Sequence, residues 1–265
     1  MLSLNALKKR KEKKCIYWWE PSDGSFNAGD HLSKIIVQQM LTLRDKEIVD
    51  KTKTNNKLLA IGSVMHFARD NDCVWGTGIN GKISSNELKF QTLDVRAVRG
   101  PKTRKLLMDM GIFVPEIYGD PGLLLPYFFP EETLLIDAEE KKDYIIIPHM
   151  NEDLRLYDKY SHNICTPKQG AISFTKEIVN SKLVISSSLH GVIIAEAYGI
   201  PAILLKNSSG ESSFKYDDYY HGSGRDSYPT AATVDEAFSI EPAQGIDVYA
   251  IAKPLFSAFP YDLWS

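Results

Sequence analysis

The chain has 265 residues, of which 43% are hydrophobic and 25% are charged, with a formal net charge of −3 at pH 7. This composition excludes a wholly disordered, collagen-like or coiled-coil protein. The charge balance excludes a basic surface over the whole protein, so we expect no nucleic-acid partner. No apolar run approaches the roughly 20 residues of a membrane-spanning helix. At about 150 residues per domain, the length favours two small domains or one large one.

Cysteine usage and the first residues favour a cytoplasmic setting. Cys15, Cys73 and Cys165 include no CxxC pair, which indicates a reducing compartment, with Cys15 as a buried core thiol. The basic run KKRKEKK at residues 8–14 is not followed by an apolar segment, so it does not read as a signal peptide. It is either a solvated segment or a weak electrostatic tether to anionic lipid at the inner face of the membrane.

From residue 15 onward, short apolar runs alternate with helical patterns. In the first half we expect strands at 15–19, 58–61, 73–75, 95–98 and 117–118, and helices at 31–43 and 103–110. In the second half we expect strands at 144–147, 183–185 and 200–205, and a helix at 189–198. This alternation predicts βα units and a mostly parallel sheet.

The predicted fold class is therefore α/β, with two Rossmann-like lobes facing a cleft. A basic segment at 1–14 precedes a first lobe at 15–125, and a proline- and acid-containing connection spans 126–142. A second lobe at 143–265 ends in a closing C-terminal segment. Ligands of such sheets bind beyond the carboxyl ends of the strands, where most of the unusual residues of this chain stand.

One such strand end is the turn Ser186-Ser187-Ser188. It leads directly into a predicted helix, so its backbone N–H groups form an anion site. His190 falls in the first helical turn, where it is placed to act as an acid, a base or a phosphate donor. Gly191 allows another group to approach the backbone closely. The alternative is a capping serine beside a packed histidine.

Arg99, Asp120 and His149 also follow predicted strands. Arg99 ends a buried strand, so we expect its guanidinium in the cleft, where it can hold a carboxylate or phosphate with two parallel bonds. Asp120 is either a turn residue or a carboxylate placed at a strand end. His149 follows the strand at 144–147 and should face the cleft.

The first βα loop closes with Asn27, Gly29 and Asp30. Taken alone, these are plausible turn and helix-capping residues. Two other strand ends carry Gly62-Ser63 and Gly76-Thr77-Gly78. The second of these lacks the third glycine of a dinucleotide fingerprint, so a nicotinamide cofactor is poorly supported. The histidine spacings fit no metal site.

Residues 214–225, FKYDDYYHGSGR, are rich in aromatic and charged side chains and contain two glycines. They predict a mobile loop over the cleft, with Gly222 and Gly224 as flexible points. Tyr216, Tyr219 and Tyr220 would offer platforms for a sugar, and Lys215 and Arg225 could reach an anion. A surface loop fixed by its aromatic side chains is the alternative.

Taken together, these motifs resemble the polysaccharide pyruvyl transferase family, and most of all its bacterial exopolysaccharide branch, of the succinoglycan type. The matching pieces run in family order over residues 15–225: Asn27-x-Gly29-Asp30, Gly62-Ser63-Val64, Trp75-Gly76-Thr77-Gly78, Arg99-Gly100-Pro101-x-Thr103, Gly119-Asp120-Pro121, Pro148-His149, Ser188-Leu189-His190-Gly191 and Gly199-Ile200-Pro201. Each motif is short, and the order and spacing make the resemblance specific.

The resemblance implies a fold like the two-lobed GT-B glycosyltransferases, with phosphoenolpyruvate as donor and a lipid-linked saccharide as acceptor. The product would be a pyruvate ketal on two oxygens of one sugar of an exopolysaccharide or cell-surface glycan, formed without a cofactor or metal. The implied catalytic residues are His190, His149, Arg99 and Asp120, with the two histidines as acid and base in either order. The residues expected to bind substrate are Asn27, Gly29, Asp30, Gly62, Ser63, Gly76, Thr77, Gly78, Ser186, Ser187, Ser188, Gly191, Lys215, Tyr216 and Arg225.

The chain departs from the family pattern at one position. Some members carry an arginine immediately before Leu-His-Gly, where this chain has Ser188. Either Arg99 and Arg225 take over the donor anion, or the donor site is arranged differently. Two other functions stay open, namely a nucleotide-sugar glycosyltransferase with the same two-lobed fold and a non-catalytic sugar-binding protein.

Overall fold

The computed structural model describes residues 15–49, 52–135, 140–206 and 208–264. The basic run at residues 8–14 lies outside them, so its contact with a membrane stays a prediction. Within the described ranges, no helix combines the length and the apolar character that crossing a bilayer requires. Cys15, Cys73 and Cys165 are free thiols and all three are buried, as expected for Cys15.

The first sheet contains four parallel strands in sequential order: β1 (Ile16–Tyr17), β2 (Leu58–Leu59), β3 (Cys73–Trp75) and β4 (Asp94–Ala97). Its connections hold α1 (Ala28–Thr42), α2 (Pro101–Asp109) and the 3-10 turns η1 (Met65–Phe67) and η2 (Ser85–Glu87). The strand expected at 117–118 is reduced to one parallel bridge between Val98 and Tyr118. Helix α1 begins three residues earlier than predicted, which brings Gly29 and Asp30 into its first turn.

The second sheet is also parallel and sequential: β5 (Ile145–Ile147), β6 (Val184–Ser186), β7 (Ala202–Leu205) and β8 (Thr230–Ala231). Its helices are α5 (Ala171–Val179), α6 (Leu189–Ala197), α7 (Phe214–Gly222) and α8 (Val234–Ala237), with a 3-10 segment η4 (Leu154–Asn163). The connection between the sheets holds η3 (Pro121–Leu124), α3 (Leu125–Phe128) and α4 (Glu131–Leu134).

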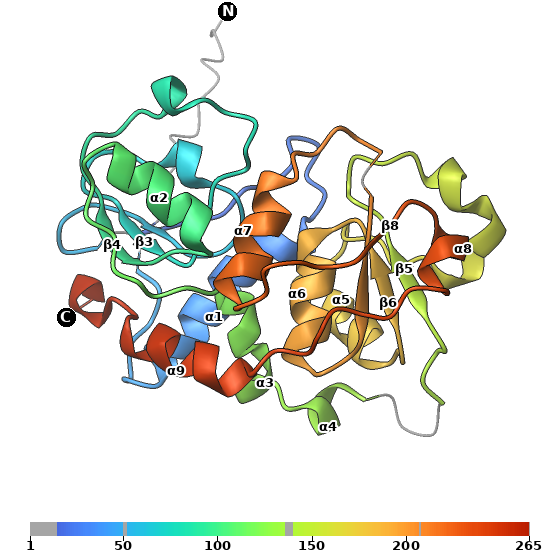
Figure 1. Ribbon diagram of the computed structural model, residues 1–265. Coiled ribbons are helices and arrows are strands. Elements are labelled where there is room, and N and C mark those ends of the chain that lie inside the picture. Colours follow the sequence, from blue (N-terminus) through green and yellow to red (C-terminus); the bar gives the residue numbers. More distant parts are fainter. Residues whose placement is uncertain (1–14, 50–51, 136–139, 207, 265) are drawn as a thin grey trace, which may run out of the picture.

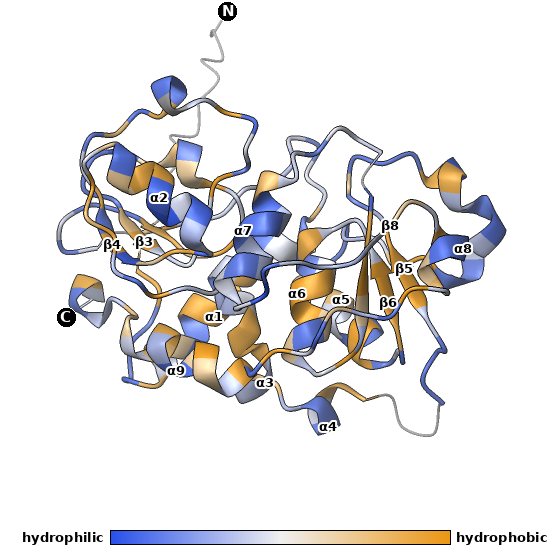
Figure 2. Cartoon of the chain, viewed as in Figure 1, coloured by the Kyte–Doolittle hydropathy of each residue, from blue (hydrophilic) through white to orange (hydrophobic). Residues whose placement is uncertain are grey.

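The two sheets share one apolar core. Leu32 and Ile36 of α1 are fully buried in the same cluster as Val192 and Ile193 of α6 and the η3 leucines. Figure 2 shows the apolar residues gathered on α6 and on the strands, in the interior of the molecule. Helix α6 is apolar nearly all round, which is typical of a helix buried between two layers. The structure therefore confirms two parallel α/β sheets, packed through α1, α6 and η3.

The C-terminal segment packs on the first sheet, although it was predicted with the second lobe. It contains α9 (Val248–Ser257) and η5 (Tyr261–Trp264), which lie beside the first sheet and α1 (Figure 1). Trp75 Nε1 of β3 donates a 2.9 Å hydrogen bond to the Leu255 carbonyl, and the Tyr261 hydroxyl donates to the Met40 carbonyl at 2.8 Å.

The mobile loop predicted at 214–225 is wrong, because most of it is helix α7. Tyr216, Tyr219 and Tyr220 form a buried face of this helix, and Asp218 is fully buried. The helix lies between the two sheets and packs on α2 (Figure 1). Gly222 is a close-packing position and not a hinge, since a β-carbon there would lie 2.4 Å from the Arg99 carbonyl oxygen.

Candidate active site

A cavity of about 230 Å³ lies between the two sheets, beyond the carboxyl ends of their strands. Both sheets contribute to its wall. The lining residues are Trp19, Asn27, Asp30, Ser63, Val64, His66, Phe67, Asn80, His149, Met150, Asn151, Pro167, Ser188, Leu189, His190, Glu211 and Lys215.

The topology of the second sheet explains why the cavity opens there. Ile146 of β5 pairs with Ile185 of β6 and also forms a parallel bridge with Ile164. Since one residue cannot pair twice on the same edge, the chain leaves β5 toward one side and reaches β6 on the other. This is the kind of switch point at which the loops of parallel sheets separate and ligands bind. His149 and Ser188 stand at the ends of these two strands.

His190 and Asp120 form a couple at the base of the cavity. The His190 Nε2 atom lies 3.6 Å from Asp120 Oδ2, and Asp120 is fully buried. Asp120 Oδ1 accepts a 2.9 Å bond from the Gly122 amide, while neither Nε2 nor Oδ2 has a closer partner among the described residues. The carboxylate thus orients the imidazole and leaves Nδ1 as the nitrogen to meet a substrate, as in an acid-base dyad.

Asp30 places a second buried carboxyl group beside His190. Its Oδ2 accepts a 2.6 Å hydrogen bond from Asn27 Nδ2. Burial raises the pKa of Asp30 to about 6; the charge of His190 opposes this rise and the carboxylate of Asp120 adds to it. A carboxyl group with a pKa near the working pH is suited to general acid-base catalysis. Asp30 was predicted to bind substrate, and its buried environment also suits it to act as a general acid or base.

His149 is held as a neutral imidazole. Its Nδ1 lies 3.4 Å from the Asn151 amide, which favours the proton on Nε2, and Nε2 lies 3.9 Å from a Glu211 oxygen. Burial lowers the pKa of His149 to about 4, and the charge of Lys215 lowers it as well. The two histidines predicted as interchangeable therefore differ in their surroundings: His190 faces the fully buried Asp120, whereas His149 lies near Glu211, which is also bonded to two lysines.

Glu152 fixes the loop that carries His149. This buried carboxylate accepts hydrogen bonds from the His149 amide at 2.9 Å, the Ser208 amide at 2.7 Å, and the hydroxyls of Tyr157 and Ser187. Burial opposes its ionisation, but these donors outweigh burial and lower the pKa of Glu152. The Ser187 hydroxyl oxygen also accepts a 2.8 Å hydrogen bond from the His149 amide. Loop 148–152, the serine turn and Ser208 thus form one rigid unit.

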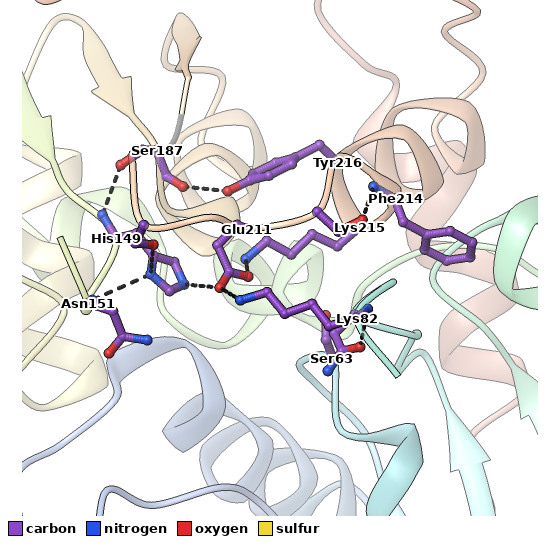
Figure 3. A network of polar contacts seen from close by, with 12 residues as sticks. Ser63, Lys82, His149, Asn151, Ser187, Glu211, Phe214, Lys215 and Tyr216 are labelled. Carbon is purple, nitrogen blue, oxygen red and sulfur yellow. Dashed lines mark hydrogen bonds and ion pairs between the residues drawn. The ribbon is translucent and has the colours of Figure 1, made fainter. Parts of the chain in front are cut away.

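Two lysines and Glu211 form a charged cluster (Figure 3), and Glu211 and Lys215 of this cluster line the cavity. Glu211 accepts hydrogen bonds from Lys82 and, at 2.6 Å, from Lys215. Burial alone would raise the pKa of Glu211, but these bonds outweigh it and lower that pKa to about 2. Lys215 is itself nearly buried beside the amino end of α6. Lys215 is thus the lysine of this cluster that lines the cavity, where it can meet an anionic substrate.

Arg99 does not enter the cavity, which corrects the expectation that it holds the donor. It is 1% exposed, and its guanidinium lies 3.3 Å from buried Asp218. Its other nitrogens donate to the Ser63 hydroxyl at 2.8 Å and the Ile79 carbonyl at 2.7 Å. The arginine therefore positions Ser63, which does line the cavity.

Arg225 and Tyr216 are also absent from the cavity wall. Arg225 forms a buried bidentate pair with Glu196, at 2.6 and 2.8 Å, so it has no free charge for a donor anion. The Tyr216 ring is buried, and its hydroxyl donates to the Ser187 carbonyl at 2.6 Å. Tyr216 joins α7 to the second lobe, and Arg225 joins the turn after α7 to it, so this segment is packed and is not a mobile loop.

Of the other predicted residues, Asn27, Asp30, Ser63, His149, Ser188, His190 and Lys215 line the cavity. The remainder lie behind its wall and support it through close backbone packing or buried hydrogen bonds: Gly29, Gly62, Gly76, Thr77, Gly78, Ser186, Ser187 and Gly191. Gly29 is the clearest case, because a β-carbon there would lie 2.1 Å from His190 Nδ1.

Several functional residues carried no usable signal in the sequence. Glu152 and Glu211 sit in polar stretches that read as ordinary loops, and their roles depend on partners far along the chain. Asn80 and Trp19 could have been found, since each follows a strand end by a few residues.

Parallel sheets, a cavity at a switch point and a buried His–Asp couple define an α/β enzyme site. The chain belongs to the polysaccharide pyruvyl transferase family, whose sequence profile matches residues 5–209, and is therefore a transferase. It is 26% identical over 226 residues to the uncharacterized protein L143 of Acanthamoeba polyphaga mimivirus, covering 78% of this chain and 75% of that protein. It is 25% identical over 215 residues to the succinoglycan biosynthesis protein ExoV of Rhizobium meliloti, covering 77% of this chain but 63% of that protein.

Proposed function

We propose that this chain transfers the pyruvyl group of phosphoenolpyruvate to two hydroxyls of one sugar residue, releasing phosphate and using no cofactor. Family membership supports pyruvyl transfer to a polysaccharide. The observation that carries the finer proposal is the meeting of three kinds of group in one cavity: the His190–Asp120 couple, the Asp30 carboxyl with its raised pKa, and Lys215 at the amino end of α6.

The donor carries a phosphate and a carboxylate, so it needs cations and free backbone N–H groups. Ser188 caps α6 without a side-chain bond to the helix, and the first-turn N–H groups of α6 suit an anion. Lys215 supplies a nearly buried positive charge, and the neutral His149 supplies an Nε2–H donor. Together these groups would orient the donor and stabilise the departing phosphate.

The proposed reaction runs in two additions. A sugar hydroxyl adds to C2 of the donor while His190 delivers a proton to C3, which becomes the methyl group. The C2–O bond to phosphate then breaks with its electron pair, and a second hydroxyl of the same sugar adds to C2. Asp30 accepts a proton from the attacking hydroxyls. One hydroxyl proton restores the acid and the other leaves with phosphate, so the charges and atoms balance.

This assignment gives the two histidines separate roles. His190 acts as the acid because its imidazole lies against the buried Asp120 carboxylate, whereas His149 is held neutral and binds the donor. The same proposal includes a GT-B-like description of the fold, a cytoplasmic site and a lipid-linked acceptor. The two parallel sheets support the GT-B-like description, and the family supports a saccharide acceptor.

The test is release of phosphate from phosphoenolpyruvate in the presence of oligosaccharide acceptors, with mass spectrometry for an added pyruvate less one water. His190→Ala and Asp120→Asn should each lower turnover by about 10²-fold or more, as expected for loss of an acid-base group. His162→Ala is the matched control, because His162 is exposed and lies outside the cavity. Release of a nucleotide from a nucleotide sugar, without use of phosphoenolpyruvate, would contradict the proposal.

A further inference from the structure

A second cavity, of about 190 Å³, lies beside the first and is built by the loop between β1 and α1. The two cavities share Trp19 and Asn27 in their walls. The residues of the second cavity are Trp18, Trp19, Glu20, Pro21, Gly24, Ser25, Phe26, Asn27 and His31. Of the second cavity's residues, only Asn27, which donates to Asp30, is involved in the chemistry proposed above.

Aromatic side chains dominate this second cavity. Phe26 is 52% exposed, and its ring lies 5.5 Å from the His31 ring. Trp18 is held in place by a 2.8 Å bond from its Nε1 to Glu20, and Lys34 Nζ lies 5.9 Å from its ring centre. A half-exposed phenylalanine beside a fixed tryptophan gives the fold little stability, whereas it offers rigid apolar surface to a ligand.

The cavity also carries polar groups at its rim. His31 Nδ1 is buried and has no hydrogen-bond partner among the described residues. The His31 ring itself lines the cavity beside Phe26. The Glu20 side chain stands nearby, exposed, with oxygens that accept hydrogen bonds. Aromatic walls with a few convergent polar groups are typical of a small-molecule site.

We infer that the second cavity is a saccharide subsite that binds the sugar next to the one being modified. This inference rests on the proposed function. A pyranose ring presents an apolar C–H face, which suits Trp18 and Phe26, and a rim of hydroxyls, which suits Glu20 and His31. A neighbouring sugar would then pass Trp19 and Asn27 and bring its hydroxyls to Asp30 and His190.

The consequence is a preference for acceptors of at least two sugar units. A free monosaccharide can occupy only one of the two cavities and so loses the contacts of the other. A disaccharide pays the entropy of association once and makes both sets of contacts.

Binding of methyl β-glucopyranoside, methyl β-galactopyranoside, cellobiose and lactose to the full chain tests this, followed by tryptophan fluorescence and by saturation-transfer NMR. The disaccharides should bind more tightly than the methyl glycosides. Phe26→Ala should weaken disaccharide binding about three- to tenfold, the size of one aromatic contact. Phe113→Ala is the matched control, because Phe113 is 81% exposed and lies outside both cavities.

Calorimetry with phosphoenolpyruvate separates failure of this subsite from failure of the proposed function. Phe26→Ala should leave the affinity for phosphoenolpyruvate unchanged. If the parent binds phosphoenolpyruvate while disaccharide binding is absent, or equal in Phe26→Ala and the parent, the subsite is overturned and the reaction survives. If the parent fails to bind phosphoenolpyruvate yet Phe26→Ala weakens disaccharide binding, the reaction fails and the saccharide site stands. Binding of uridine in place of the disaccharides would also overturn the subsite.

Discussion

His190 stands directly over Gly29, and a β-carbon at that glycine would lie 2.1 Å from the imidazole Nδ1. Gly29 belongs to α1 in the first lobe, and His190 belongs to α6 in the second. The absence of a side chain at one position thus sets the place of the proposed acid at the other.

Gly29→Ala should therefore remove activity without unfolding the protein. Alanine favours the helix at this position, but the imidazole must rotate away from its place beside Asp120. A displacement of this kind can cost about 10²-fold in turnover. Phosphate release and thermal unfolding measured together check this. Gly245→Ala is the control, because nothing lies within 4 Å of its added carbon. Parent-like turnover in Gly29→Ala would show that His190 is not the acid.

Asp30→Asn should stabilise the protein at neutral pH while abolishing turnover. Burial raises the pKa of Asp30 from 3.8 to about 6, so the folded chain binds its proton more tightly than the unfolded chain. Below pH 4 the group is protonated in both states and the free energy of unfolding is unaffected. Above pH 6 ionisation of Asp30 lowers the free energy of unfolding by about 3 kcal/mol. The amide keeps an oxygen to accept from Asn27 and removes this cost.

Urea unfolding at pH 4 and pH 7 measures the difference. The gain from Asp30→Asn over the parent should be large at pH 7 and small at pH 4. Asp158→Asn, at an exposed position, should show no such difference. An equal effect at both pH values would mean that Asp30 titrates normally.

Glu211→Gln should tighten the binding of phosphoenolpyruvate. The Glu211 carboxylate accepts hydrogen bonds from the ammonium groups of Lys82 and Lys215, and its negative charge would repel an incoming anion. An amide of the same shape removes this charge, and we expect about a tenfold lower Kd, a difference of about 1.4 kcal/mol. Calorimetric titration of the variant and of Glu132→Gln, which is exposed and distant in α4, provides the comparison. Weaker binding in Glu211→Gln would instead assign Glu211 to orienting the lysines.

Arg225→Ala should be costly for stability and neutral for donor affinity. Its bidentate pair with Glu196 is 7% exposed on each side, and removal of Arg225 leaves the Glu196 carboxylate buried with no paired cation and with the Tyr219 hydroxyl as its remaining donor. Such losses amount to about 3–5 kcal/mol. Arg155→Ala breaks a similar pair with Asp153 on the surface, where we expect little change. Chemical unfolding tests the contrast, and Glu196→Gln in the Arg225→Ala background should restore part of the loss. A weaker affinity for phosphoenolpyruvate in folded Arg225→Ala would return Arg225 to the donor site.

The amino-acid sequence by itself determined the parts of this protein that depend on local pattern. Buried strands such as Cys73–Trp75 and Ile145–Ile147 are short apolar runs, and parallel strands place their following residues at one edge. His190 and His149 could therefore be assigned to the cavity before their neighbours were known. Asp30, Gly29 and Asp120 were included because their motifs resemble those of the family.

The tertiary structure alone decided which charged residues act on a ligand and which act on each other. Arg99 and Arg225 follow the same sequence logic as the other cavity residues, yet Asp218 and Glu196 neutralise them in the interior. Burying a charge is costly unless it is paired, and a partner many residues away leaves no periodic signal in the sequence. Helix α7 was missed for a related reason: Tyr216, Tyr219 and Tyr220 are buried in the core that the two sheets share, and those contacts come from distant parts of the chain.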